Sequence, residues 1–303
     1  MNWAGASAAR LADGRLHLQH GPIDLIIEAW GERGEIEAAY GQASARFENI
    51  LEVLVQELAQ LRTPLAAAYP LLRGPVARRM LAACWPYRAH YITPMAAVAG
   101  AVADEVLQAM LQGRSLLKAY VNNGGDIALH LAHGAELTLG VVNNVDNPAI
   151  DATVSLCAST PVRGVATSGW RGRSQSLGIA DAVTVLAADA AAADAAATMV
   201  ANAVNVEHEA ISRRAARTLR ADSDLGDLQV TVAVGALPAL ARAEALTSGC
   251  ERAQTLQQQG LVFAAYLALQ GEVRAVLPAI PLVDRPLATT RLRPVCAGSL
   301  PNR

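Results

Sequence analysis

The stretch that decides the fold is Ala182-Val183-Thr184-Val185-Leu186-Ala187, followed by the alanine-rich run Ala190–Asn202. The first part is a short apolar run rich in valine, which predicts a buried strand, and the second predicts a helix. On that helix Asp194 and Thr198 lie four residues apart, so their oxygens share one face. Two hard oxygen donors on one face suit Mg²⁺. The alternative is an acid favoured by the helix dipole and a threonine that packs or bonds to its own helix, and spacing alone favours that alternative.

Further strands and helices are expected before and after this strand and helix. Residues 15–19 and 23–29 alternate in polarity around His20-Gly21-Pro22 and predict two antiparallel strands. Apolar residues at helical spacing predict one long helix over residues 35–62, and Thr93-Pro94 predicts the N-cap of a helix that ends near residue 111. Further strands are expected near residues 119–122, 127–131, 136–142, 152–157, 163–167, 228–234, 261–269 and 272–276, with a helix near 240–258. Helices mixed with adjacent antiparallel strands indicate an α+β fold. The Pro-rich residues 285–303 are expected to form an irregular tail or clasp.

A second segment, Asn122-Asn123-Gly124-Gly125-Asp126, lies between two of the expected strands. Paired glycines permit positive φ and let a ligand approach the backbone. The alternative is an ordinary hairpin turn, which the dipeptide Asn-Gly favours.

The third segment runs from Arg163 to Ser174 and combines glycines, hydroxyls and three arginines. Exposed backbone N–H groups together with guanidinium groups suit a phosphate or carboxylate. A solvated basic loop is equally consistent with this composition. Trp170 and Arg171 stand where a P-loop requires Lys and Ser or Thr, so the segment is not a P-loop.

The fourth segment, residues 221–227, contains three aspartates just before a strand. Ala233 stands where an EF-hand needs its glutamate, so a polar turn is the better interpretation, although the acids can face a shared cleft. The six histidines form neither an HExxH motif nor another recognisable metal pattern, and no GxSxG motif occurs.

The composition narrows the class of protein. The chain of 303 residues is 52% hydrophobic and 17% charged, which excludes a disordered protein. A formal charge of −2 and an aromatic content of 4% argue against binding nucleic acid. Four dispersed cysteines fit free thiols, the N-terminus does not resemble a signal peptide, and Asp189 and Asp194 interrupt the least polar run. We therefore expect a cytoplasmic protein that binds neither nucleic acid nor membrane.

Taken in order, the segments resemble the ApbE family of flavin transferases. Family members carry a helix motif ending in Gly-x-x-x-Asp, then Asn-x-Gly-Gly-Asp, Ser-Gly, and a Val-Thr-Val strand leading to Ala-Asp-x-x-x-Thr. The matching pieces here are Gly100 with Asp104, Asn122 to Asp126, Ser168-Gly169, Val183 to Val185, and Ala193-Asp194 with Thr198. Their order and approximate separations hold over most of residues 93–205. In particular, the chain resembles a short cytoplasmic branch that shares the start His20-Gly21-Pro22-Ile23-Asp24.

The resemblance implies an α+β fold of tunnelling-fold type, in which antiparallel sheets pack with helices. It implies a single domain over residues 1–303, either undivided or built as two intertwined halves by internal duplication. Because tunnelling-type folds commonly associate through their sheets, it also implies a homodimer.

The resemblance also implies a chemistry in which Mg²⁺ engages the FAD pyrophosphate, a protein threonine attacks, FMN is transferred and AMP leaves. Asp194 and Thr198 would be the catalytic residues and metal ligands, helped by a backbone carbonyl near Val98. The residues expected to contact the nucleotide are Thr93, Gly100, Asp104, Asn123, Gly124, Gly125, Asp126, Ser168, Gly169, Arg171 and Arg173.

Two departures from the family pattern bear on that chemistry. The usual His-x-x-x-Pro-x-Thr-Gly segment is absent between Gly169 and Val183, and Ala99 stands where the family has Lys. Arg171 and Arg173 are candidates to replace the lost positive charge. Three hypotheses follow: a Mg²⁺-dependent enzyme acting on a flavin nucleotide or related pyrophosphate, a non-catalytic binding module for a nucleotide or heterocyclic anion, and a scaffold protein.

Overall fold

A computed structural model describes residues 4–144, 148–278 and 293–294. Its main element is a nine-stranded sheet in the order β1-β2-β3-β4-β5-β8-β9-β12-β13, in which every neighbouring pair is antiparallel. The strands are β1 (Ser7–Arg10), β2 (Leu16–His20), β3 (Ile23–Gly31), β4 (Leu116–Asn123), β5 (Asp126–Leu131), β8 (Gly164–Ser168), β9 (Ala182–Ala187), β12 (Ala264–Leu269) and β13 (Glu272–Val276). The described sheet thus combines strands from both ends of the sequence.

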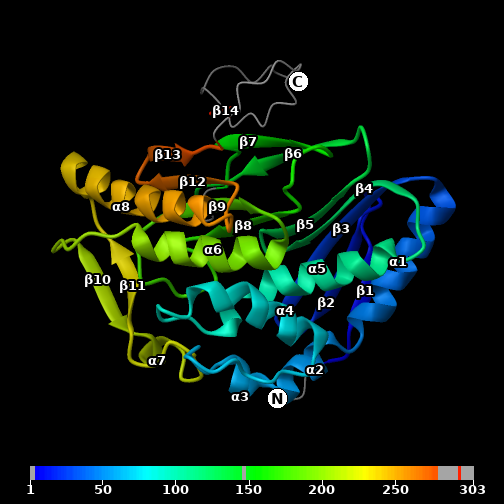
Figure 1. Cartoon of the computed structure of the whole chain (residues 1–303), viewed down its shortest axis with the longest axis horizontal. Coiled ribbons are helices and arrows are strands. Elements are labelled where there is room, and N and C mark those ends of the chain that lie inside the picture. The colour runs from blue at the N-terminus through cyan, green and yellow to red at the C-terminus, as the bar shows by residue number, and fades with distance from the viewer. Residues whose placement is uncertain (1–3, 145–147, 279–292, 295–303) are drawn as a thin grey trace.

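Two smaller sheets accompany it. One has the order β14-β7-β6 and consists of β6 (Glu136–Val141), β7 (Ala152–Cys157) and β14 (Arg293–Pro294). The other pairs β10 (Ile211–Ala215) with β11 (Gln229–Val234) and lies apart from the main sheet, beside α8 and α7 (Figure 1).

Helices cover one face of the main sheet (Figure 1). The helices of the described residues are α1 (Arg33–Phe47), α2 (Ile50–Gln56), α3 (Leu58–Leu61), α4 (Pro75–Cys84), η1 (Trp85–Tyr87), η2 (Pro94–Ala97), α5 (Val98–Leu111), α6 (Ala190–Ala203), α7 (Ala216–Leu219) and α8 (Ala239–Gln258), of which α7 lies beside β10 and not on the main sheet. The alanines of α6 are almost all buried, because this helix packs against β8 and β9 on one side and against α5 and α8 on others.

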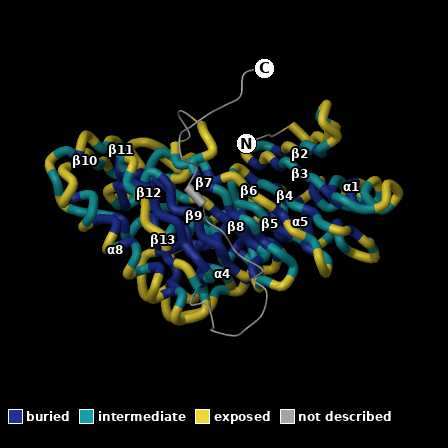
Figure 2. Tube along the Cα trace, turned by 90° about the horizontal axis from the view of Figure 1, so that it is seen from above, coloured by how far each residue is buried: buried dark blue, intermediate teal, exposed yellow. Residues whose placement is uncertain are grey.

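The core has two parts. The larger lies between the main sheet and the helices, and the smaller joins the sheet's other face to β6 and β7. Leu129 and Val165 of the main sheet pack there with Leu137 and Val154. Buried residues accordingly run through the middle of the molecule, with exposed ones at its periphery (Figure 2). The predicted α+β fold, with antiparallel sheets packed against helices, is confirmed, whereas the tunnelling-fold type and the internal duplication stay predictions.

The predicted long helix over residues 35–62 is wrong, because that stretch forms α1, α2 and α3. The breaks fall at Asn49 and Glu57, whose ψ angles of 7° and 9° are not helical. Glu57 instead accepts hydrogen bonds from the backbone N–H groups of Arg73 and Gly74, both at 2.7 Å. Because the chain bends at Asn49 and Glu57, most of the apolar side chains of α1, α2 and α3 stay buried against the core. Sequence patterns also missed β1, β10, α4, η1 and α7, and most of the predicted tail over residues 285–303 lies outside the described residues.

The stretch Pro94–Leu111 has the length and mean hydropathy, 1.2, of a weak membrane-span candidate, the one such helix among the described residues. In the structure it packs against α6, α4 and the main sheet, and 56% of it is buried. Core helices meet the same criteria of length and composition, so the stretch is not evidence for a membrane span.

Candidate functional site

Two half-buried carboxylates, Asp126 and Asp194, form the centre of the candidate site. Asp194 extends from α6, and its Oδ2 accepts a hydrogen bond from the Gly100 N–H at 3.0 Å. Asp126 begins β5, and its Oδ1 accepts one from the Thr167 N–H at 3.2 Å. Burial raises the pKa of both carboxyls, and the charge of Asp126 raises that of Asp194 further. The fold therefore holds two acids together although their mutual repulsion opposes it.

Three of the sequence motifs meet at this pair. Gly100 of α5 contacts Asp194, and the side chain of Asn123 donates to the Ala99 carbonyl at 3.1 Å. The turn that begins at Asn123 ends at Asp126 itself. Tertiary structure thus joins residues that lie more than 90 positions apart in the chain.

The predicted metal ligands lie on α6 and at the start of α5. Hydrogen bonds from backbone N–H groups act against the rise in the pKa of both carboxyls, from Thr167 for Asp126 and from Gly100 and Ala99 for Asp194. Half-buried Thr198 lies one helical turn beyond Asp194, and Val98 begins α5 two residues before Gly100. The described residues contain no group of three or more His, Cys, Asp or Glu side chains able to hold a metal. Carboxylate, hydroxyl and carbonyl oxygens are the ligand types that Mg²⁺ takes, so these residue types suit it, and the metal site itself stays a prediction.

Gly100 is required where α5 crosses α6. A Cβ atom at this position would lie 2.2 Å from the carbonyl oxygen of Ala190, so only glycine permits the observed approach. This contact brings the Gly100 N–H to Asp194. Whether Gly100 also contacts a nucleotide stays a prediction.

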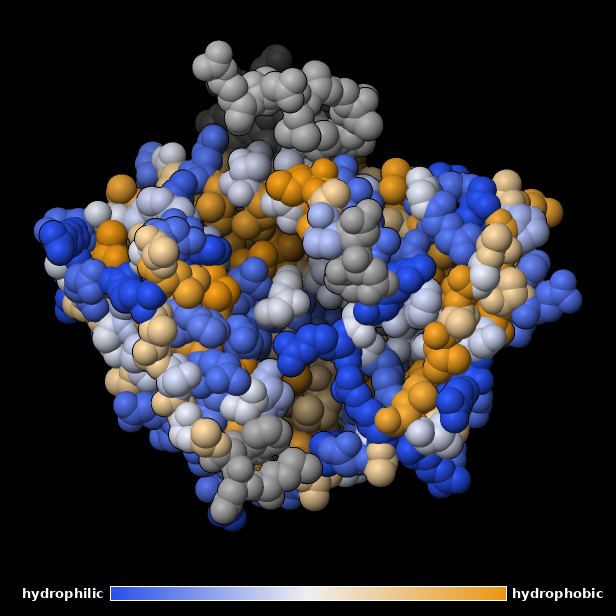
Figure 3. All heavy atoms as spheres, turned by 180° about the vertical axis from the view of Figure 1, so that it is seen from behind, coloured by the Kyte–Doolittle hydropathy of each residue, from blue (hydrophilic) through white to orange (hydrophobic). Residues whose placement is uncertain are grey.

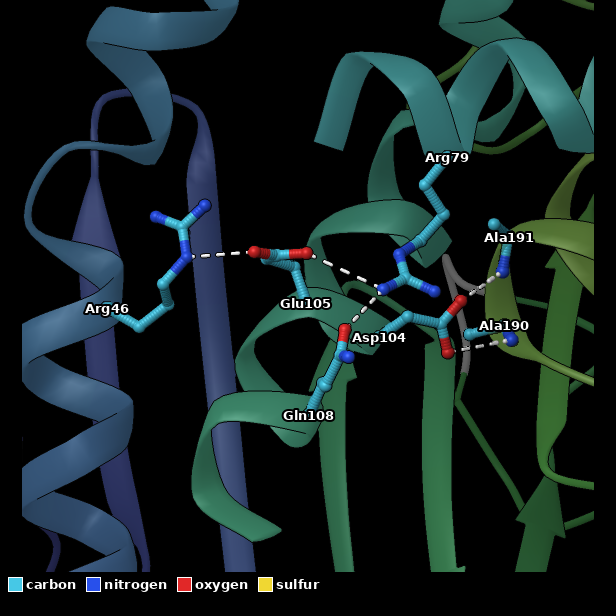
Figure 4. A network of polar contacts seen from close by, with 7 residues as sticks. All are labelled: Arg46, Arg79, Asp104, Glu105, Gln108, Ala190 and Ala191. Atoms are coloured by element: carbon cyan, nitrogen blue, oxygen red, sulfur yellow. Dashed lines mark hydrogen bonds and ion pairs between the residues drawn. The ribbon is translucent and has the colours of Figure 1, made fainter. Parts of the chain in front are cut away.

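Asp104, also predicted to contact the cofactor, caps α6 in the structure. Its two carboxylate oxygens accept hydrogen bonds from Ala190 N–H at 3.0 Å and Ala191 N–H at 2.9 Å (Figure 4). The Asp189 carboxylate accepts the N–H of Ala192, the next residue of the helix. Burial, and then the neighbouring Asp189, raise the pKa of Asp104 to about 7. Both oxygens accept hydrogen bonds from the helix that carries Asp194, so Asp104 helps to hold that helix in place. Its predicted contact with a cofactor is untested.

The next residue, Glu105, ties three helices together. Its carboxylate bonds Arg46 of α1 at 2.9 Å and contacts Arg79 of α4 at 3.5 Å (Figure 4). Arg79 also donates to Gln108 at 2.7 Å. The network holds α5 in place from the side opposite α6.

The glycines of the second segment form the hairpin turn between β4 and β5. Gly124 and Gly125 have φ angles of 65° and 111°, which other residues rarely adopt. Gly125 N–H donates to Asn122 Oδ1 at 2.8 Å. The ordinary-turn interpretation is therefore right for the conformation, and the same turn delivers Asp126 to the site.

The two arginines of the third segment differ in position. Arg171 stacks on Trp170, with 4.4 Å to the ring centroid, and pairs with Asp181 at 3.2 Å. Exposed Arg173 donates to the Pro22 carbonyl at 3.1 Å, and its Nη1 would lie 3.7 Å from a Cβ atom on Gly124. Arg173 therefore lies beside the glycine turn, whereas Arg171 is directed at Asp181.

Ser168 and Gly169 connect β8 to that segment. A Cβ atom on Gly169 would lie 2.3 Å from the Asp181 carbonyl oxygen, so close backbone packing accounts for this glycine. Ser168 is half-buried at the end of β8. Their predicted contacts with a nucleotide are untested.

Thr93 is the N-cap of η2, as predicted, because its hydroxyl oxygen accepts the Met95 N–H at 3.2 Å. Its hydroxyl proton goes to the carboxylate of Asp224. Sequence reasoning did not assign Asp224 to the site. The acidic run of residues 221–227 was the one available signal, through the interpretation that its acids face a shared cleft.

Two surface cavities lie elsewhere. One of about 520 Å³ is lined by residues of β3 and α1, including Glu28, Trp30 and Tyr40, and one of about 320 Å³ by residues that include Arg79, Asp104 and Arg163. Neither is lined by Asp126 or Asp194. The face opposite the helices also shows a hollow with hydrophobic residues at its floor (Figure 3).

Comparisons with known proteins complete the description. A family model described as "AbpE bacteria" matches residues 8–275. A UPF0280 protein of Methanothermobacter thermautotrophicus is 38% identical over 134 residues, 44% of this chain and 50% of that protein. A UPF0280 protein of Methanococcus vannielii is 36% identical over 159 residues, 50% of this chain and 64% of that protein. The chain thus spans about half to two-thirds of the length of these relatives.

Two solved structures were also found. The Pseudomonas stutzeri flavinyl transferase ApbE has 12% identity and a TM-score of 0.41, covering 91% of this chain and 96% of that one. The ApbE protein of Thermotoga maritima has 12% identity and a TM-score of 0.42, covering 89% and 96%. The assignment to a family depends on the family model, which spans most of the chain.

Proposed function

Because this chain belongs to the AbpE bacteria family, we propose that it handles a flavin nucleotide or related pyrophosphate at the Asp126–Asp194 site. The observation that carries the proposal is that Gly100 bonds Asp194, Asp126 acts on its charge, and Asn123 bonds Ala99 next to Gly100, although these residues come from separate motifs. Motifs that act separately need not lie together in the fold, whereas a site that binds a cation and a phosphate requires residues from several motifs at one place.

Each group has a distinct part in this proposal. Asp194 and Thr198 would hold Mg²⁺ together with the Val98 carbonyl, and Asp126 adds negative charge beside them. When bound, the cation would stabilise charge on phosphoryl oxygens. The Gly100 N–H orients the Asp194 carboxylate, and the glycine turn leaves room for a ligand to approach the backbone.

The finer proposal is Mg²⁺-dependent chemistry on FAD. Transfer would break the pyrophosphate bond, join FMN to an acceptor hydroxyl and release AMP, with the hydroxyl proton passing to solvent. With water in place of the acceptor, the products would be FMN and AMP. Arg173, beside the glycine turn, supplies a positive charge at the rim of the site.

A second candidate function is binding without turnover. It is favoured by the absence of the His-x-x-x-Pro-x-Thr-Gly segment, since in its place Arg171 pairs with Asp181 and stacks on Trp170. This module would retain a nucleotide or heterocyclic anion.

The test is incubation of the purified protein with FAD and MgCl₂, scored by AMP release. We expect release by the wild type, loss in Asp194→Ala, and unchanged release in Asp13→Ala, which removes an exposed acid elsewhere. Native mass spectrometry separates the two candidates, because a retained and intact nucleotide indicates binding alone. A protein that neither releases AMP nor binds FAD contradicts both.

We also propose that the chain acts as a single domain, as a homodimer and in the cytoplasm, without binding nucleic acid or membrane. Light scattering coupled to size-exclusion chromatography tests the dimer, and a monomeric mass would contradict it.

A further inference from the structure

The loop that precedes β11 reaches across the molecule to η2. Asp224 in this loop accepts the Thr93 hydroxyl hydrogen bond, and the Tyr91 hydroxyl donates to the Asp224 backbone carbonyl. These contacts span more than 130 residues of sequence. The loop therefore contacts the segment that leads into α5, although the two are remote in the chain.

A series of hydrogen bonds leads from Asp224 to the candidate metal site. Thr93 accepts the Met95 N–H at 3.2 Å, and the Met95 carbonyl accepts the Val98 N–H. Two residues further on, the Gly100 N–H reaches Asp194 at 3.0 Å. The conformation of residues 93–100 thus determines where the Val98 carbonyl and the Gly100 N–H lie relative to Asp194.

The electrostatics agree with this placement. The buried Cys84 thiol has its pKa raised well above the ordinary value, by burial first and then by the charges of Asp194 and Asp224. Both carboxylates therefore lie near the same thiol, whose sulfur contacts the Pro94 carbonyl at 3.8 Å. Asp224 and Asp194 approach η2 from different elements of the fold.

Other contacts hold the loop independently of Asp224. Asp222 pairs with Arg62 at 2.7 Å, and the Ser223 hydroxyl donates to Gln175. Losing the Asp224 carboxylate would therefore remove the bond to Thr93 while leaving these contacts in place. Asp222 provides a matched control, since it is an acid of the same loop that does not contact η2.

We propose that Asp224 is a positioning residue for the candidate site: through the Thr93 hydroxyl it fixes the backbone of residues 93–100, and with it the Val98 carbonyl and Gly100 N–H beside Asp194. The proposal deepens the proposed function, because the positioned backbone is the one expected to hold Mg²⁺. Outer groups that orient metal ligands typically contribute tenfold to a hundredfold in metal affinity.

The experiment compares Asp224→Ala, Asp224→Asn, Thr93→Val, Thr93→Ser and Asp222→Ala with the wild type. Hydrogen exchange of the amides of residues 95–100 reports the backbone, and electron paramagnetic resonance reports the affinity for Mn²⁺. We expect Asp224→Ala and Thr93→Val to speed exchange at residues 95–100 and to weaken Mn²⁺ binding about tenfold. Asp224→Asn and Thr93→Ser keep an acceptor or a hydroxyl and should restore both properties, and Asp222→Ala should change neither.

The double variant Asp224→Ala with Thr93→Val should be no worse than Thr93→Val alone, because Thr93→Val already removes the bond to Asp224 together with the cap on the Met95 N–H. The proposal would be overturned if the Asp224→Ala variant had the same amide exchange rates at residues 95–100 and the same Mn²⁺ affinity as the wild type. If Asp224→Ala fails to fold, Asp224→Ser takes its place, because it also removes the carboxylate and leaves the Thr93 cap on the Met95 N–H intact. If the wild type binds no Mn²⁺, the proposed function fails, and the exchange measurements alone decide whether Asp224 positions the backbone.

Discussion

Replacing Gly100 by alanine tests the close approach of α5 and α6. The added Cβ would lie 2.2 Å from the Ala190 carbonyl oxygen, 2.5 Å from its carbonyl carbon and 2.8 Å from the nitrogen of Ala191. All three atoms belong to backbone, so a side-chain rotation cannot relieve the clash and the helices must separate. Separating the helices would also stretch the two hydrogen bonds that the N–H groups of Ala190 and Ala191 donate to Asp104.

The expected magnitude follows from these terms. Overpacking a core typically costs about 1–3 kcal/mol, and weakening two buried hydrogen bonds adds about 1–2 kcal/mol. Alanine regains about 1 kcal/mol of helix propensity over glycine. We therefore expect Gly100→Ala to lower the free energy of unfolding by about 1–4 kcal/mol.

Gly41→Ala is the matched control. Gly41 also lies within a helix, α1, but a Cβ atom there would meet nothing within 4 Å. Relief of the glycine penalty should then raise the free energy of unfolding by about 0.5–1 kcal/mol. The two identical substitutions are thus expected to change stability in opposite directions.

Urea denaturation followed by circular dichroism measures both variants, with the transition midpoint as the readout. A Gly100→Ala midpoint at or above that of the wild type would refute the reasoning, since it would mean that α5 and α6 do not approach as closely as described. Equal losses in both variants would also refute it.

Three further predictions concern the site. Because the pKa of Asp104 is raised from 3.8 to about 7 in the folded state, the folded protein binds more protons than the unfolded chain between those values, so this group makes stability fall as pH rises from about 4 to 7. Asp104→Asn should flatten that slope in urea midpoints taken from pH 5 to 8, and an unchanged slope would contradict it. MgCl₂ at about 100 times its dissociation constant should stabilise the wild type by about 2.7 kcal/mol, and removal with EDTA should reverse this. Asp194→Ala should show no such shift by calorimetry. Arg173→Ala should weaken FAD binding several-fold by titration calorimetry, while Arg171→Ala, which removes the partner of Asp181, serves as the comparison.

Much of the local structure was predictable from the sequence. The alternation around His20-Gly21-Pro22 predicted the β2–β3 hairpin, and Thr93-Pro94 predicted the cap of η2. The run at residues 182–203 predicted β9 and α6. These predictions succeeded because each depends on a period or a cap chemistry that acts within a few residues.

The long helix over residues 35–62 failed for the complementary reason. Its apolar spacing is helical throughout, but Glu57 takes its partners from Arg73 and Gly74, which are distant in sequence. A period of apolar residues does not reveal where the chain must bend to follow the rest of the fold, as it does at Asn49 and Glu57.

The sequence by itself determined the segments whose apolar period or cap chemistry is local, such as β2, β3, β9 and α6, and it showed an isolated acid, Asp194, among alanines. Only the tertiary structure decided what surrounds that acid. Asp126, Gly100 and the Asp224–Thr93 link reach the site through contacts that cross many tens of residues, and the raised pKa of Asp194 arises from burial and from Asp126. Burial and through-space charge depend on how the layers close over one another, which local patterns do not encode.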